Sequence, residues 1–468
     1  MNDIKEIYSL IKDISLEDKE LIQKAFDFAN LAHAGYVRKS GEPYINHLFG
    51  TAKNLASLGM NAVVVSAGLL HDSIEDTEIT SHDIEKEFGP EILFLVEGVT
   101  KLGSIKYRGT NRYNESMRKL FIAMSKDLRV LIIKLCDRLH NMQTLQHVPK
   151  EKQLRIAKET LEIYAPLAYR LGIKTLQREL EDLAFSYAYP KEFEEIKKIL
   201  KKKKDEVEEH LDNFEKSLKK ELAKNDITEF RMDHRVKSMY SLYKKLEKYK
   251  WEVEAIYDIS ALRVTVKEVA DCYRILGIVH GAWRPLPGRI KDYIASPKLN
   301  GYRSIHTTIF TGDGGIIEVQ IRTEEMHNEA EYGVASHLSY KEGGRNTSWI
   351  QELVDFQKEA GDDFLEHAKK DFFEERIFVF TPIGDVIDLP KESTVIDFAY
   401  AIHTDIGEHV AGAKVNGKFV AITKELQNGD RVEVETKKSA RPSKKWLENC
   451  KTTMARRKIT NYLENTKS

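Results

Sequence analysis

The sequence predicts a multidomain protein of the α and α/β classes, with a helical N-terminal block, a mixed α/β block and a small β-grasp-like module. Three observations support this prediction. The 468 residues exceed what a single hydrophobic core usually organises. Apolar residues recur at helical spacing up to about residue 190, with no alternating strand pattern. Runs rich in β-branched residues, separated by helical stretches, begin only after Ile227.

Changes of pattern along the chain place the boundaries. Residues 1–190 form the helical block, and the charge-rich run 191–224 keeps a helical period, so we expect a connecting helix there. Its lysines are flanked by acidic residues, which favours a solvated helix face over a nucleic-acid patch. The remaining segments are a mixed α/β domain at 225–345, a helical linker at 346–375, the β-grasp-like module at 376–436 and a basic helical tail at 437–468. Within the module, Asn416-Gly417 predicts a type I′ hairpin turn.

Composition excludes several classes of protein. Lys plus Arg (73) nearly equals Asp plus Glu (74), so there is no global basic excess for coating nucleic acid. The three cysteines lie far apart, which excludes a disulfide scaffold and a local zinc site and favours a reducing, cytoplasmic compartment. The longest apolar stretch, Ala62–Leu70, is far too short to cross a bilayer, so no membrane partner is expected.

Histidines and carboxylates in the helical block predict a metal site. The candidate ligands for a divalent transition ion such as Mn²⁺ are His47, His71, Asp72 and Asp137. If residues 69–76 are helical, Glu75 and Asp76 lie one turn from His71 and Asp72, where they could orient or deprotonate a metal-bound water. A lone His-Asp pair is usually structural. Here it follows a buried apolar run and a second segment supplies Asp137, so the combined pattern favours a metal site.

Polar residues in the α/β block predict a site for a triphosphate. Lys237, Ser241 and Lys245 recur at helical spacing, with Arg235 just upstream, so one helix face offers two cations and a hydroxyl. Asp258 and Glu318 lie in separate strand-like runs and are candidate Mg²⁺ ligands. Arg263 falls on the opposite face of the strand from Asp258, so a shared site needs a turn or bulge between them.

The segment 287–308 offers a place for a nucleotide base. Tyr302 supplies an aromatic plane beside Gly301, and Lys298, Arg303 and His306 add hydrogen-bond donors. Each residue alone has a structural interpretation, with Tyr302 in the core and Lys298 solvating a loop. The string as a whole favours nucleotide binding, because so many polar residues interrupt a strand-like segment.

The stretches AHAGYVRKSGEPYINH, LLHDSIEDT and KLCDRLHNMQTL resemble the HD hydrolase domain of the RelA/SpoT (Rel) family. Members of that family are bifunctional synthetase–hydrolases of (p)ppGpp in the bacterial stringent response. The resemblance implies that the Mn²⁺ ligands are His47, His71, Asp72 and Asp137. It assigns Glu75 and Asp76 to the nucleophilic water, Arg38 and Lys39 to the substrate phosphates, and Asn141 and Thr144 to the nucleotide pocket. Gln143 stands where the family often has arginine, a departure that removes no ligand.

The string PGRIKDYIASPKLNGYRSIHTT resembles the family's synthetase domain. That domain is a mixed α/β, nucleotidyltransferase-like fold that moves pyrophosphate from ATP to the 3′-hydroxyl of GDP or GTP. The resemblance implies that Asp258 and Glu318 are catalytic and bind Mg²⁺, and that Tyr302 stacks on guanine. The implied nucleotide-binding residues are Arg235, Lys237, Ser241, Lys245, Arg263, Lys298, Asn300, Tyr302 and His306. The regulatory motif of bifunctional members is matched by Arg289, Lys291 and Asp292, so a bifunctional enzyme is expected.

Residues 376–436 resemble the TGS domain, which in long family members reads the 3′ end of uncharged tRNA on the ribosome. His403 matches the histidine at that contact, and a packing or capping histidine is the equal alternative. The further C-terminal domains of long members do not follow, so we expect a truncated or short member, which argues against ribosome binding. Two alternatives stay open: a hydrolase with an inactive synthetase, and a tRNA- or ribosome-binding regulator. Because synthesis and hydrolysis oppose each other, we also expect reciprocal coupling, with 191–224 as the link.

Overall fold

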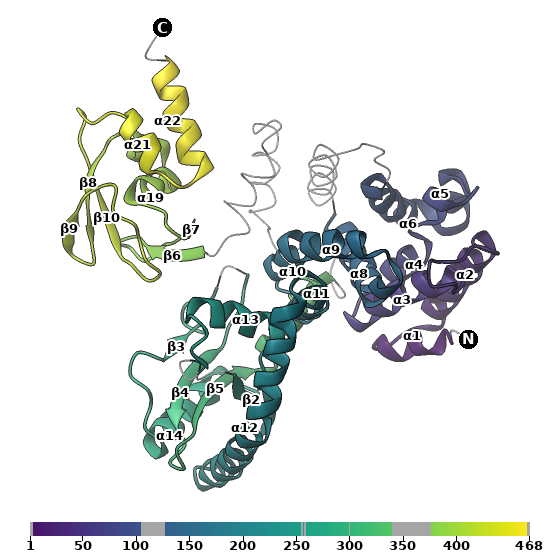
Figure 1. Cartoon of the computed structure of the whole chain (residues 1–468), viewed down its shortest axis with the longest axis horizontal. Helices are drawn as coiled ribbons and strands as arrows, with labels where there is room; N and C mark the ends of the chain where they lie inside the picture. Colours follow the sequence, from purple (N-terminus) through teal and green to yellow (C-terminus); the bar gives the residue numbers. More distant parts are fainter. Residues whose placement is uncertain are drawn as a thin grey trace. The chain divides into compact units, whose positions relative to one another are not determined.

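The computed structural model describes residues 3–103, 127–253, 256, 259–298, 300–338 and 376–465. These residues fall into two compact units, one within 3–338 and the other within 376–465. Figure 1 shows the elements in their order along the chain. The linker expected at 346–375 and the candidate ligand Asp258 lie outside the described residues.

The first part of the larger unit is helical, as the sequence predicted. Its α-helices are α1 Lys5–Leu10, α2 Leu16–Ala32, α3 Ile45–Ser57, α4 Ala62–Leu70, α5 Ser73–Asp76, α6 Ser81–Gly103, α8 Leu128–Gln143, α9 Lys150–Glu159, α10 Ala165–Arg170 and α11 Lys174–Ala188. A 3-10 turn at Leu145–His147 and a π-helix at Thr160–Tyr164 join them. Helix α4 is apolar on every side and almost wholly buried, so it forms the centre of this block. Its first turn is capped by Asn61, whose side chain accepts from the Val64 N–H.

A five-stranded mixed sheet forms the second part of the larger unit. Its strands are β1 Phe230–Val236, β2 Ser260–Val266, β3 Lys291–Asp292, β4 Ile305–Phe310 and β5 Ile316–Thr323. The order across the sheet is β1-β2-β5-β4-β3, with β2 and β5 parallel and the other pairs antiparallel. The accompanying helices are α13 Met239–Lys248, α14 Val269–Ala282, α15 Glu324–Tyr332 and α16 Ala335–Leu338.

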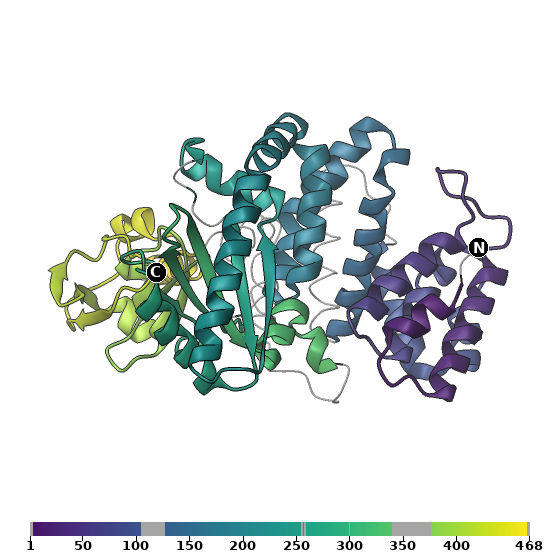
Figure 2. The ribbon, with the colours of Figure 1, turned by 90° about the horizontal axis from the view of Figure 1, so that it is seen from below.

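Helix α12 (Pro190–Lys224) lies where the sequence predicted a connecting helix. Figures 1 and 2 show it running alongside the strands. Its later turns bury Leu211, Phe214 and Leu218 in the same apolar cluster as the core-facing residues of the sheet. Thus the long helix connects the two parts of the unit and also packs on one face of the sheet.

The two faces of the sheet differ in polarity. One face carries alternate apolar residues of β2 and β5, such as Val264 and Val319, and packs against α12 and α14. The strand register places Arg263 of β2 opposite Asp233 of β1 and Gln320 of β5, and His306 of β4 opposite Gln320. Because side chains alternate along a strand, polar residues of these four strands share the other face. The candidate nucleotide site lies on that face.

The smaller unit is an α/β module with a three-stranded and a two-stranded sheet. Its elements are β6 Arg376–Phe380, β7 Val386–Pro390, α19 Val395–Ile402, α20 Thr404–Glu408, β8 Val410–Val415, β9 Lys418–Val420, β10 Val432–Thr436, α21 Lys444–Asn449 and α22 Thr453–Asn465. The turn between β8 and β9 has φ of 52° at Asn416 and 80° at Gly417. These two positive φ angles are those of the predicted type I′ turn.

The two helices of the basic tail pack on the core of this module. Trp446 of α21 and Ala455 and Ile459 of α22 belong to the same buried cluster as Phe398 of α19. The tail is therefore part of one core with the strands that precede it.

Asp397 joins α19 to the tail. The residue is fully buried, and it accepts hydrogen bonds from the backbone N–H groups of Thr394 (2.7 Å), Lys451 (3.0 Å) and Thr452 (2.8 Å). The hydroxyls of Thr394 and Thr452 also donate to it. A buried carboxyl group with so many donors has its hydrogen-bonding capacity well satisfied.

Replacing Asp397 with alanine should destabilise the smaller unit by about 3 kcal/mol, because buried N–H and O–H donors lose their acceptor. We expect faster amide hydrogen exchange in α19 and α22, measured by mass spectrometry on the full chain. Asp405→Ala is the matched control, because the Asp405 side chain is 81% exposed. That change should alter the free energy of unfolding by less than about 0.5 kcal/mol. Equal exchange in the two variants would contradict the role given to Asp397.

Candidate active sites

The candidate metal ligands of the helical block come from separate elements. His47 lies in α3, Asp137 lies in α8, and His71 and Asp72 lie between the end of α4 and the start of α5. The two helices meet at this pair, so residues 69–76 are not the single continuous helix that the spacing argument assumed. His47 Nε2 lies 3.3 Å from Asp137 Oδ1 and 3.6 Å from Asp72 Oδ2, and His71 Nε2 lies 3.2 Å from Asp72 Oδ2. The structure thus brings all four residues together.

The chemistry of this cluster fits a divalent cation. Ligand atoms of His47, His71 and Asp137 all lie within 4.8 Å of one another. His71 Nδ1 donates to the carbonyl oxygen of Gly68 (2.8 Å), which aims Nε2 at the carboxylates. That Nε2 atom is buried and faces Asp72 Oδ2 at 3.2 Å, on the side where a cation would lie. Metal-binding histidines usually show this arrangement, with the outer ring nitrogen on a carbonyl and the inner one free for the ion.

Burial and charge set the protonation of the cluster. Burial lowers the pKa of His47. At His71 burial acts in the same direction, but Asp72 and Asp137 outweigh it and raise the pKa to about 9. Burial would raise the pKa of Asp137, but Lys134, whose Nζ lies 2.7 Å from Asp137 Oδ2, helps to hold it well below its usual value. The cluster therefore holds ionised carboxylates and one protonated imidazole, whose proton a bound cation would replace.

Glu75 and Asp76 lie beside the cluster on α5. Tyr44 Oη lies 2.8 Å from both Asp72 Oδ2 and Asp76 Oδ2, so it links a candidate ligand to Asp76. Burial and the charge of Asp72 raise the pKa of Glu75. A glutamate with a raised pKa is a better proton acceptor near neutral pH, which suits a residue that handles a nucleophilic water.

Residues expected on the substrate side gather at the end of α8. Arg38 donates to Asn141 Oδ1 (2.6 Å) and to Thr144 Oγ1 (3.1 Å). Asn141 in turn donates to Asp137 Oδ1 (2.5 Å), so this group adjoins the metal cluster. Lys39 is exposed on the loop that carries Arg38.

Sequence reasoning assigned no role to Tyr44, Lys134 or His140, which the structure places in this site. His140 Nδ1 lies 2.9 Å from His47 Nδ1 and 3.5 Å from Arg38 Nη1. Burial and the neighbouring His47 lower the pKa of His140 to about 3, so its imidazole is neutral. A signal existed in the sequence, because Lys134 and His140 lie three residues either side of Asp137, on the same side of one helix.

A second cluster on the polar face of the sheet is centred on Glu318. His306 Nδ1 donates to Glu318 Oε1 (2.8 Å), and Tyr302 Oη donates to His306 Nε2 (2.7 Å). Gln320 donates to the other oxygen of Glu318 (3.1 Å) and accepts from Arg235 (3.1 Å). Burial lowers the pKa of His306, so its ring is neutral and takes one donor and one acceptor role. Four predicted site residues are thereby joined in one network.

Arginines make the rest of this face positive. Arg263 Nη2 and Arg322 Nη2 lie 3.4 Å and 3.2 Å from Glu331 Oε1. Burial would raise the pKa of Glu331, but Arg178 and these two arginines lower it to about 2. The Nε atoms of Arg235 and Arg263 are buried without a hydrogen-bond partner among the described residues. Each can donate to an anion such as phosphate.

The helix expected to carry three phosphate-binding residues begins later than predicted. Ser238 is the N-cap of α13 and accepts from the Ser241 N–H (3.4 Å). Lys237 therefore precedes the helix, and only Ser241 and Lys245 lie on it. A serine hydroxyl satisfies a free N–H of the first turn, which explains the later start.

The loop before β4 forms a tight turn that presents Tyr302. The Lys298 N–H donates to the Tyr302 carbonyl (3.1 Å), and the Gly301 N–H donates to the Lys298 carbonyl (2.8 Å). Gly301 has φ of 76°, which favours glycine there. Burial and the nearby Lys291 lower the pKa of Lys298 to about 8. The turn holds Lys298, Asn300 and Tyr302 at the edge of the second cluster.

Asp292 of the regulatory motif and His403, the candidate tRNA contact, both have local structural roles. Asp292 accepts from the N–H groups of Ile294 and Ala295 (2.9 Å each), and so fixes the turn after β3. Lys291 pairs with His306 across β3 and β4, and Arg289 precedes it.

In the smaller unit, His403 Nδ1 accepts from the Asp405 N–H (3.2 Å) and caps α20, while its side chain is 65% exposed.

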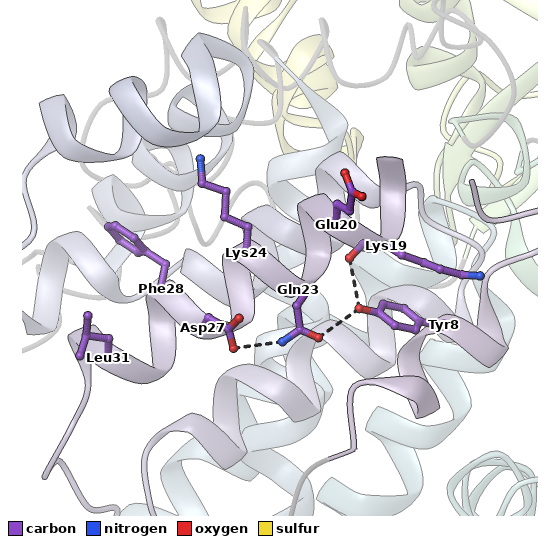
Figure 3. Close-up of a pocket in the computed structure, with 8 residues that line it drawn as sticks. All are labelled: Tyr8, Lys19, Glu20, Gln23, Lys24, Asp27, Phe28 and Leu31. Atoms are coloured by element: carbon purple, nitrogen blue, oxygen red, sulfur yellow. Dashed lines mark hydrogen bonds between the residues drawn. The ribbon is translucent and has the colours of Figure 1, made fainter. Parts of the chain in front are cut away.

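A shallow groove of about 700 Å³ is lined by α1 and α2. Figure 3 shows its lining, in which Tyr8 donates to Gln23 and Gln23 donates to Asp27. None of its eight lining residues belongs to either polar cluster.

Among the helices that the structure describes, none is both long and apolar enough to span a membrane.

Three family descriptions match the chain in succession. An HD domain covers residues 25–174, the region found in RelA/SpoT proteins covers 234–345, and a TGS domain covers 377–436. A protein of Borreliella burgdorferi, named guanosine-3′,5′-bis(diphosphate) 3′-pyrophosphohydrolase, is 43% identical over 456 residues, which are 95% of this chain and 68% of that protein. This chain belongs to the RelA/SpoT family.

Other relatives in the family carry two different names. The relative from Aquifex aeolicus, also named a guanosine-3′,5′-bis(diphosphate) 3′-pyrophosphohydrolase, is 45% identical over 95% of this chain and 65% of its own length. The one from Myxococcus xanthus, named GTP pyrophosphokinase, is 44% identical over 96% of this chain and 61% of its own length. Among solved structures, small alarmone synthetase 2 of Bacillus subtilis aligns with 36% of this chain at 26% identity, with a TM-score of 0.25. The chain spans about two thirds of the length of these curated relatives.

The protonation of the first cluster predicts a pH dependence of metal binding. A ligand imidazole must be unprotonated, and the pKa of His71 is raised to about 9, so binding below that pH displaces a proton. His47, whose pKa is lowered, has none to release at neutral pH. We expect the apparent affinity for Mn²⁺, measured by calorimetry, to rise about tenfold per pH unit up to about pH 8.5.

Asp76→Asn is the control for this titration, because it leaves the four ligand side chains in place and should keep the slope. Asp72→Asn removes the charge that raises the pKa of His71, so it should flatten the slope as well as weaken binding. An affinity that does not change between about pH 7 and 8.5 would contradict the protonation assigned to His71.

Proposed function

We propose that this chain is a bifunctional enzyme that makes and degrades (p)ppGpp at two separate sites. The observation that carries the proposal is the presence of two distinct clusters, each with the charge excess that one reaction needs. The first offers anionic and imidazole ligands to a metal ion. The second offers cations and one carboxylate to a polyphosphate and a hydroxyl. The names of the relatives, one group hydrolases and the other pyrophosphokinases, support both halves.

The first cluster is proposed to hydrolyse (p)ppGpp to GDP or GTP and pyrophosphate. His47, His71, Asp72 and Asp137 would hold Mn²⁺, which acidifies a water and so supplies the nucleophile. Glu75 and Asp76 orient that water and accept its proton. Arg38, Lys39, Asn141 and Thr144 hold the phosphates and the nucleotide, and the hydrogen bonds from Arg38 to Asn141 and Thr144 favour this grouping.

The second cluster is proposed to transfer pyrophosphate from ATP to the 3′-hydroxyl of GDP or GTP. Glu318 accepts the hydroxyl proton, and His306 holds the carboxylate in place. Asp258 and Glu318 would hold Mg²⁺, which screens the phosphate charge during transfer. Arg235, Lys237, Ser241, Lys245 and Arg263 bind the ATP phosphates, with Lys298, Asn300 and Tyr302 around the guanine. The buried free Nε donors of Arg235 and Arg263 support the phosphate assignment.

Partners and location follow from the same proposal. The small-molecule partners are ATP, GDP or GTP, and (p)ppGpp. The exposed His403 leaves a contact with deacylated tRNA on the ribosome sterically open in the smaller unit, although its capping bond gives it a structural role as well. All three cysteines are free and buried, which supports a reducing, cytoplasmic location.

Two substitutions test the two-site proposal directly. Asp72→Ala should lower (p)ppGpp hydrolysis by more than about a hundredfold, because it removes a metal ligand, and should leave synthesis unchanged. Glu318→Gln should lower synthesis by about a hundredfold or more and leave hydrolysis unchanged. Both activities are read by anion-exchange chromatography, one with ATP, GDP and Mg²⁺ and the other with ppGpp and Mn²⁺.

Each variant is the control for the other, and circular dichroism checks that both are folded. Loss of both activities in one folded variant would rule out two separate sites. Hydrolysis without synthesis in the unsubstituted chain would favour the hydrolase with an inactive synthetase. Neither activity, together with salt-dependent binding of deacylated tRNA, would favour the regulator.

A further inference from the structure

The turn between α10 and α11 of the helical block docks directly on the second cluster. The Val334 N–H donates to the carbonyl of Leu171 (3.0 Å), and the Thr175 hydroxyl donates to the carbonyl of Glu331 (3.0 Å). The Asn300 side chain donates to the carbonyl of Tyr169 (3.4 Å). Residues 169–175 thus contact both the loop that presents Tyr302 and the end of α15.

This junction is a close fit of backbone against backbone. Gly172 has φ of 75° and Gly333 has φ of 53°, so both have conformations that favour glycine. A Cβ at Gly172 would lie 3.1 Å from the Cα of Gly333, and a Cβ at Gly333 would collide with the Leu171 carbonyl. The fit places the first residue of α11, Lys174, at one defined position in the second cluster.

Lys174 covers the ring of Tyr302. Its Nζ lies 3.7 Å from the ring centroid, a cation–π contact. Tyr293 and His306 pack edge-on against the same ring, and Tyr302 as a whole is only 3% exposed. Lys298 Nζ also lies over this ring, 5.4 Å from its centroid. Because the ring is almost wholly buried, a base can stack on Tyr302 only if something moves.

The position of Lys174 over the Tyr302 ring is electrostatically unfavourable. Lys174 is buried near Arg235, Lys298 and Arg322, which disfavour its charged form, whereas the carboxylate of Glu331 favours it. Burial and these cations hold the pKa of Lys174 well below its usual value. The junction therefore holds the ammonium group where burial and its neighbours disfavour its charged form, and moving the turn away would relieve that cost.

We propose that the α10–α11 turn is a removable cover on the guanine-stacking face of Tyr302, with Lys174 in the place of the base. A guanine nucleotide binds there only after the turn has moved off. This inference rests on the proposed function, because it takes Tyr302 as the residue that stacks on guanine. Helix α11 also packs against α8, which carries Asp137, so this turn is a more direct link between the two sites than α12.

Binding of GDP to the full chain, measured by calorimetry, tests the cover. Lys174→Ala removes the nearer of the two lysine side chains over the ring, whereas Lys174→Met keeps the apolar stem over it and removes only the ammonium group. We expect Lys174→Ala to bind GDP about two- to thirtyfold more tightly than the unsubstituted chain, the range that loss of one cation–π contact allows. It should also bind more tightly than Lys174→Met. Equal or weaker binding by Lys174→Ala than by Lys174→Met would overturn the proposal.

Hydrogen exchange on the unsubstituted chain gives an independent measurement. Saturation with GDP should speed amide exchange at residues 169–175, because the docked turn is released. Slower exchange there would mean that Lys174 is a ligand of the nucleotide, and would overturn the proposal.

Tyr302→Ala separates this inference from the proposed function. If that change leaves GDP affinity untouched, the guanine role of Tyr302 itself is wrong. If it abolishes GDP binding while exchange at 169–175 in the unsubstituted chain does not respond to GDP, the guanine site stands and the cover is wrong.

Discussion

One carboxylate, Glu331, joins the helical block to the polar face of the sheet. Its two oxygens contact Arg178 of α11 (2.5 Å), Arg322 of β5 (3.2 Å) and Arg263 of β2 (3.4 Å). Arg322 is only 1% exposed, so without Glu331 its charge would be buried with no counter-ion among the residues that the structure describes. Because β2 and β5 are parallel neighbours, the same contact also holds together the two strands at the centre of the second cluster. The position of α11, and of the turn that begins it, follows from this interaction.

The two clusters show opposite electrostatic designs. In the first, the imidazoles and Lys134 hold the pKa values of Asp72 and Asp137 low, so a bound cation that replaces the proton of His71 would face two ionised carboxylates. In the second, buried cations gather around Glu318, and burial together with Lys291 and Arg235 lowers the pKa of Lys298. The charged groups of each cluster are complementary to its proposed ligand. That ligand is a metal cation in the first cluster and a polyphosphate in the second. Such sites are costly when empty and gain most from the matching ligand.

The sequence predicted best what near neighbours in the chain determine. The Asn416-Gly417 turn, the helical character of the first block and the strand character of the run that carries Glu318 are all local properties. The spacing of residues 237–245 predicted that Lys237 lies on the helix, which is wrong. Ser238 caps the helix, so α13 begins only at Met239. Lys174 could not be found at all, since nothing in its surroundings in the sequence indicates that it reaches Tyr302. Contacts of that kind depend on how separately formed parts dock, which periodicity does not encode.

The shared core of the smaller unit bears on where such modules can be divided. The family description of the TGS domain ends at residue 436, yet Trp446, Ala455 and Ile459 fill the same core and the donors to Asp397 lie at 451 and 452. A fragment cut at 436 would expose an apolar surface and leave the Asp397 side chain without its donors from Lys451 and Thr452. The stability and solubility of that fragment would then reflect the loss of α21 and α22 rather than the properties of the domain. The unit that can be moved intact into another chain therefore runs from β6 to the end of α22, because the strands and these two helices share one core.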